Sequence, residues 1–116
     1  MIEVDRHRFE DMVGEALDTL PAEFTRLMRN VVVQVEDAPP DGPGDGLFGL
    51  YEGVPLTERM SDYSAVLPDR ITIFRLATLA ACDSEAEVVA EVRTTVVHEV
   101  GHHFGIDDDR LHELGY

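Results

Sequence analysis

The stretch from Ser84 to Phe104 constrains the fold of this chain most, because its apolar residues return with the period of an α-helix. Five valines supply one continuous apolar helix face: Val88, Val89, Val92, Val96 and Val100. Ser84 with Glu87 three residues later is typical of a helix N-terminus, where the serine hydroxyl accepts a backbone N–H. Valine is only a modest helix former. Packing against the rest of the domain must therefore hold this helix together.

Two histidines lie on the last turns of this predicted helix, in the stretch His98-Glu99-Val100-Gly101-His102. Residues four apart on an α-helix lie about 40° apart around the axis, so both imidazoles point the same way and can bind one metal ion. Glu99 projects to one side of that ion, where it can take a proton from a metal-activated water without being a ligand. The spacing predicts zinc bound by His98 and His102, with Glu99 as the catalytic general base.

A catalytic zinc site also needs a third protein ligand and one open position. Gly105 can adopt a positive φ and end the helix, so that the chain turns back toward the metal. The spacing then favours Asp108 as the third ligand. Three nearby residues remain open as its replacement: Asp107, Asp109 and His112.

Two further residues of ligand type receive other roles. His103 points about 100° away from His102 around the helix axis, so we do not expect it to bind the same ion. Cys82, the single cysteine, is expected to be a small buried hydrophobic residue near the helix start.

The net charge is −15, from 24 acidic and 9 basic residues, and all the basic residues are arginine. Such a surface repels phosphate backbones and anionic lipids, so we expect neither a nucleic acid nor a membrane partner. A neutral or cationic peptide or protein substrate suits it better. With 116 residues, one cysteine and no visible signal segment, the chain is expected to be a single domain (1–116) in the cytoplasm.

The rest of the chain predicts an α+β domain. A first helix, capped by Asp5, carries apolar residues at three- and four-residue spacing: Phe9, Met12, Val13, Ala16, Leu17 and Leu20. Three strands are expected at Val31–Val35, Leu47–Tyr51 and Ile71–Phe74. A short helix from about Asp109 to Leu114 closes the chain.

The stretch Thr95–Gly105, followed by Asp107–Asp109, resembles the zincin metalloproteases, and specifically small bacterial zincin-like proteins of minimal metallopeptidase type. The segments Leu50–Leu56 and Arg70–Arg75 are also similar to that family. The resemblance implies a small mixed β-sheet packed against an N-terminal helix and an active-site helix, with the ion in a cleft between sheet and helix.

By the same resemblance, His98, His102 and Asp108 ligate zinc, and Glu99 acts as base and then acid in peptide-bond hydrolysis. In larger zincins an edge strand above the cleft binds substrate by strand addition. The stretch Leu47–Pro55 is our candidate for that rim.

The chain departs from the larger zincins, because no Met-containing turn follows Asp108 and no second subdomain forms a lower cleft wall. Two alternatives therefore stay open. One is a metal-dependent endoribonuclease, since such enzymes of ribosomal RNA maturation have a similar ligand spacing, although they lack a Glu after the first His and are basic. The other is a non-catalytic metal-binding module, in which His112 or Cys82 supplies a fourth ligand.

Overall fold

The structure is a computed structural model that describes residues 1–42, 46–53 and 67–116. The predicted rim at Leu47–Pro55 therefore extends in part beyond the described residues. The elements in chain order are α1 (Arg6–Asp18), α2 (Ala22–Leu27), β1 (Val31–Glu36), β2 (Gly49–Glu52), β3 (Asp69–Phe74), α4 (Arg75–Ala81), α5 (Glu85–His103) and α6 (Asp108–Glu113). This order confirms the α+β class, and each predicted helix and strand is present to within two residues at either end.

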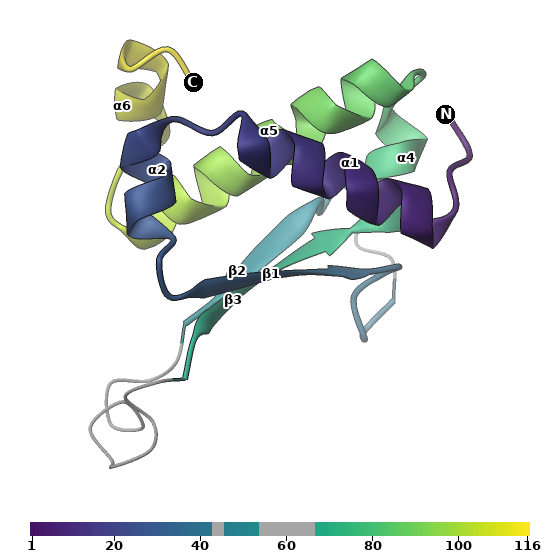
Figure 1. Cartoon of the computed structure of the whole chain (residues 1–116), viewed down its shortest axis with the longest axis horizontal. Helices are drawn as coiled ribbons and strands as arrows, with labels where there is room; N and C mark the ends of the chain where they lie inside the picture. The colour runs from purple at the N-terminus through teal and green to yellow at the C-terminus, as the bar shows by residue number, and fades with distance from the viewer. Residues whose placement is uncertain (43–45, 54–66) are drawn as a thin grey trace.

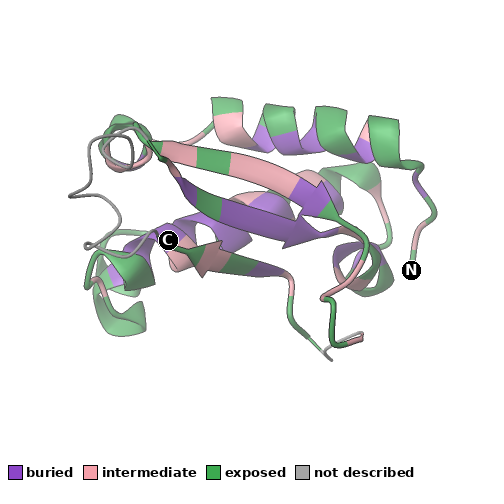
Figure 2. Ribbon diagram, turned by 90° about the horizontal axis from the view of Figure 1, so that it is seen from below, coloured by how far each residue is buried: buried purple, intermediate pink, exposed green. Residues whose placement is uncertain are grey.

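The three strands form a mixed sheet in the order β1-β3-β2. β1 runs parallel to β3, with Val33 opposite Ile71, whereas β2 runs antiparallel to β3, with Tyr51 opposite the same residue. The helices α1, α4 and α5 lie on one side of this sheet (Figure 1). The central strand, β3, is the most continuously buried of the three (Figure 2). The predicted small mixed sheet packed against two main helices is thus confirmed.

The N-terminal helix α1 begins at the predicted cap, where the Asp5 carboxylate accepts the backbone N–H of Arg8 at 2.8 Å. Its buried face is the one that the spacing predicts: Phe9, Met12, Val13 and Ala16. This face packs against α5 and shares the core with the inward side chains of the sheet. The apolar period of the sequence alone therefore identifies the helix and the side that it buries.

The long helix α5 is the centre of the core. Four of its five predicted valines are fully buried: Val88, Val92, Val96 and Val100. At its start the Ser84 hydroxyl accepts the N–H of Glu87 at 3.1 Å, while the Glu87 carboxylate accepts the N–H of Asp83 at 2.7 Å. This is the reciprocal cap that the sequence predicts, except that the glutamate accepts the N–H of the residue before the serine and not that of the serine itself.

The helix α4 was not predicted. It follows β3 without a turn, and its first residue is preceded by Phe74, whose side chain cannot cap it. Contacts with the chain after β1 hold it instead: Arg75 donates to the Asp37 carboxylate at 2.9 Å, and the Leu76 N–H to the Asp37 carbonyl at 3.1 Å. Alanine, leucine and arginine are strong helix formers, so the local propensity of Arg75–Ala81 favours a helix, and these contacts fix where it lies.

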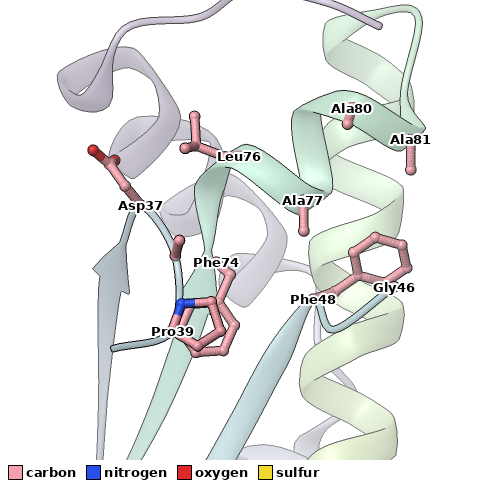
Figure 3. Close-up of a pocket in the computed structure, with 10 residues that line it drawn as sticks. Asp37, Pro39, Gly46, Phe48, Phe74, Leu76, Ala77, Ala80 and Ala81 are labelled. Atoms are coloured by element: carbon pink, nitrogen blue, oxygen red, sulfur yellow. The ribbon is translucent and has the colours of Figure 1, made fainter. Parts of the chain in front are cut away.

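The outer side of α4 borders an apolar pocket of about 390 Å³. Its other walls come from the segments around Pro39 and Phe48 and from the ring of Phe74, as Figure 3 shows. None of the predicted site residues lines it.

Candidate metal centre

The chain turns back after α5 through a left-handed glycine, as predicted. Gly105 has φ +83°, its N–H bonds to the carbonyl of His102 at 3.1 Å, and the Ile106 N–H bonds to the carbonyl of Gly101 at 2.7 Å. This pair of bonds is the Schellman arrangement, which ends a helix sharply and reverses the chain.

The next helix, α6, then starts at once. The Asp107 carboxylate accepts the N–H of Arg110 at 2.8 Å and so caps α6, which places Asp108 in its first turn. α6 is held close to α5 by Leu111, which is fully buried beneath Gly101. A methyl group built on Gly101 would lie 3.1 Å from a methyl group of Leu111, so the glycine permits this close approach.

These turns bring His98, His102 and Asp108 together. Asp108 Oδ1 lies 2.7 Å from Nε2 of His102 and 3.2 Å from Nδ1 of His98. The hydrogen bond to His102 lowers the pKa of the Asp108 carboxyl below its ordinary value, and the bond to His98 acts in the same direction. The carboxyl therefore stays ionised, as a metal ligand must be.

The donor set fits a zinc ion. One ligand atom from each of the three residues lies within 4.8 Å of the other two. Ligand atoms in a tetrahedral zinc site with bonds of about 2.0–2.1 Å stand about 3.4 Å apart, so small side-chain rotations suffice to seat an ion. The His102 side chain is 48% exposed and that of Asp108 is 64% exposed. The site is therefore open to solvent on one side.

The other candidate ligands lie elsewhere. The carboxylate of Asp107 is engaged as the cap of α6, and Asp109 and His112 are exposed on α6 outside the cluster. Cys82 is a buried core residue, as predicted, only 4% exposed. Among the described residues, the cluster contains three candidate ligands and no fourth.

Glu99 borders a cleft beside the cluster. The cleft has a volume of about 230 Å³, and its walls are the segment 46–49 on one side and α5 on the other. From α5 it is lined by Glu91, Thr94, Thr95, His98 and Glu99. The segment 46–49 leads into β2, which in the described part of the chain pairs only with β3 and so lies at the sheet edge. The cleft thus brings together the half-buried carboxylate of Glu99, the predicted ligand His98 and the segment that leads into the edge strand.

A group of polar and aromatic side chains at the C-terminal end of α5 was not predicted. The Tyr51 hydroxyl donates to the Asp69 carboxylate at 2.6 Å, and the Tyr51 ring stacks on His103 with centroids 3.9 Å apart and planes at 17°. Asp69 is only 8% exposed. In the sequence Asp69 follows a proline and resembles a turn residue, so nothing indicates that its carboxylate is buried. The one indication of this group is the position of Tyr51 on its strand, which predicts an inward-facing side chain.

Residues 28–116 match the zincin-like metallopeptidase family, and the chain belongs to that family. It is similar in structure to a conserved hypothetical protein from Thermus thermophilus, with a TM-score of 0.57 and 25% sequence identity. That alignment covers 86% of this chain and 94% of the other. No curated protein matches this chain. In the part of the chain that the structure describes, no helix is long and apolar enough to cross a membrane.

Proposed function

We propose that this protein is a zinc-dependent metallopeptidase with His98, His102 and Asp108 as metal ligands and Glu99 as the general base. One observation carries the proposal: the three ligand atoms converge within 4.8 Å of one another, and one of the three residues, His98, lines the same cleft as Glu99. Membership of the zincin-like metallopeptidase family supports the same activity.

The residues of the site divide the chemistry between them. A bound zinc ion supplies Lewis acidity, which polarises a carbonyl group and lowers the pKa of water. Glu99 follows the first ligand on the helix and faces the cleft with His98, so its carboxylate can take the proton from an attacking water and pass it to the leaving amine. The open side of the cluster leaves room for the substrate carbonyl.

The cleft favours an extended peptide as substrate. Since β2 lies at the edge of the sheet formed by the described residues, its outer backbone groups can pair with a peptide that adds as a further strand. A peptide in that position runs between β2 and the cleft wall that carries His98 and Glu99. The net charge of −15 favours neutral or cationic peptides over acidic ones.

Peptide cleavage by the zinc-loaded protein tests this function. A mixed library of unstructured peptides is incubated with zinc-loaded protein and with protein stripped by a chelator, and new termini are identified by mass spectrometry. We expect cleavage only with the loaded protein, restored when zinc is returned. Intact peptides with a fully zinc-loaded sample would contradict the peptidase assignment.

A further inference from the structure

The side chains of Tyr51, Asp69 and His103 connect the three elements that meet beside the cleft. Tyr51 belongs to the edge strand β2, Asp69 begins the central strand β3, and His103 is the last residue of α5. Hereafter these three residues are called the tyrosine network. It is offset from the metal cluster around α5, because His103 is rotated about 100° from His102.

The contacts within the network are close. A buried carboxylate, that of Asp69, accepts the Tyr51 hydroxyl at 2.6 Å and so fixes the tyrosine ring. The ring in turn covers the imidazole of His103, with centroids 3.9 Å apart. Nε2 of His103 is 3.7 Å from Asp69, which is too long for a hydrogen bond, so ring stacking is the main contact of the histidine.

Neighbouring groups also contact the same histidine, although 37% of its side chain stays exposed. Phe104 meets both rings edge-on, with its centroid 4.9 Å from that of His103 and 6.5 Å from that of Tyr51. Gly53, directly after β2, approaches so closely that a methyl group on it would lie 3.1 Å from Cε1 of His103.

The last turn of α5 needs such an external contact. The Schellman bonds at Gly105 fix the local path of the chain, but they do not fix where the turn lies relative to the sheet. On one side the turn rests on Leu111 of α6, and on the other it is held by the tyrosine network. This turn carries His102, and the chain leaving it carries Asp108.

We propose that the tyrosine network is a positioning device that holds the last turn of α5 against the edge strand, so that His102 and Asp108 are preorganised for the metal. The proposal rests on the proposed zinc site. Tyr51, Asp69 and His103 are positioning residues, since among the described residues none of them belongs to the ligand cluster or lines the cleft beside Glu99. Loosening the network leaves all three ligands in place but raises the cost of ordering them when the ion binds.

Zinc affinity tests the proposal, with a matched control in the same chain. Tyr51→Phe removes one hydroxyl bonded to a carboxylate, and Tyr116→Phe removes another, which donates to Glu23 at 2.5 Å between the chain end and α2. Zinc dissociation constants are measured by competition with a chromophoric chelator on folded protein. We expect Tyr51→Phe to raise the constant about tenfold and Tyr116→Phe to leave it within about twofold of the unsubstituted protein. Equal constants for all three proteins would overturn the proposal.

Two substitutions at His103 separate stacking from charge. His103→Phe keeps an aromatic face for Tyr51 and should bind zinc nearly as well as the unsubstituted protein. His103→Ala removes the face and should weaken binding at least as much as Tyr51→Phe. If the alanine variant binds zinc normally, stacking on His103 does not position the site.

Hydrogen exchange in the metal-free protein tests the network without the ion. The N–H groups of Phe104, Gly105 and Ile106 bond back to the last turn of α5. They should exchange faster in Tyr51→Phe than in Tyr116→Phe, and equal rates would contradict the network. A protein that binds no zinc but shows this difference would refute the proposed function while retaining the positioning role.

Discussion

The Oδ1 atom of Asp108 lies 2.7 Å from Nε2 of His102, although the two residues are six positions apart in the sequence and lie on different helices. The approach depends on the left-handed Gly105, on the cap of α6 by Asp107, and on the contact of Leu111 with Gly101. This geometry selects Asp108 among the neighbouring acidic residues as the candidate third ligand.

Substitution of the three aspartates tests that selection. Asp108→Ala should weaken zinc binding by roughly 100-fold or more, because it removes a metal ligand itself and not merely a residue that orients a ligand. Asp107→Asn keeps an N-cap and Asp109→Asn changes an exposed side chain, so both should bind zinc almost normally. Competition titrations measure all three constants. A larger loss in Asp107→Asn or Asp109→Asn than in Asp108→Ala would reassign the ligand.

Gly49 sets the distance between the edge strand and α5. A methyl group on Gly49 would lie 2.6 Å from Cγ2 of Thr95 and 3.1 Å from the carbonyl oxygen of Thr72. Gly49→Ala should therefore displace β2 from α5 and lower the free energy of unfolding by about 1–3 kcal/mol, measured by urea denaturation.

A substitution of Thr95, combined with Gly49→Ala, provides the control for that prediction. Thr95→Ser removes Cγ2 but keeps the hydroxyl that donates to the Glu91 carbonyl at 2.9 Å. The double variant should recover part of the stability lost in Gly49→Ala. If the two effects are simply additive, the clash with Thr95 is not the cause of the loss.

The Asp37–Arg75 pair gives a defined pH dependence to the contact between α4 and the chain after β1. The hydrogen bond from Arg75 lowers the pKa of the Asp37 carboxyl in the folded protein. The contribution of the Asp37–Arg75 pair to the free energy of unfolding is therefore fully present above the pKa of about 3.9 that an aspartate has in the unfolded chain. This contribution is lost as the pH falls through the lower pKa of Asp37 in the folded protein.

Asp37→Asn should accordingly be less stable than the unsubstituted protein at pH 7, and the difference should shrink as the pH falls below about 4. Urea denaturation of the two proteins across this range measures the effect. A difference that is constant with pH would show that the ion pair contributes nothing.

Some features of the fold and of the candidate site can be predicted from a few neighbouring residues in the sequence, and others cannot. The α5 helix, its cap at Ser84, its buried valines and its glycine stop could all be predicted, because each depends on residues within a few positions of one another. The spacing of His98, His102 and Asp108 also predicted their convergence, since one helix and one turn determine it.

Other features depend on contacts across the chain and gave little local signal. The pairing of β1 with β3 joins residues such as Val33 and Ile71, which are far apart in sequence. The position of α4, though not its helical conformation, depends on its contact with Asp37, and the stacking of Tyr51 on His103 requires β2 to meet the end of α5. Such contacts become visible only when the elements are placed in space.

The central claim, that a metal site with Glu99 as base performs hydrolysis, is tested most directly by one comparison. The unsubstituted protein and Glu99→Gln are both loaded with zinc, and zinc content and peptide cleavage are measured on the same samples. We predict one zinc ion per chain in both proteins and a loss of cleavage in Glu99→Gln of about 100-fold or more. Equal cleavage by the two zinc-loaded proteins would contradict the account.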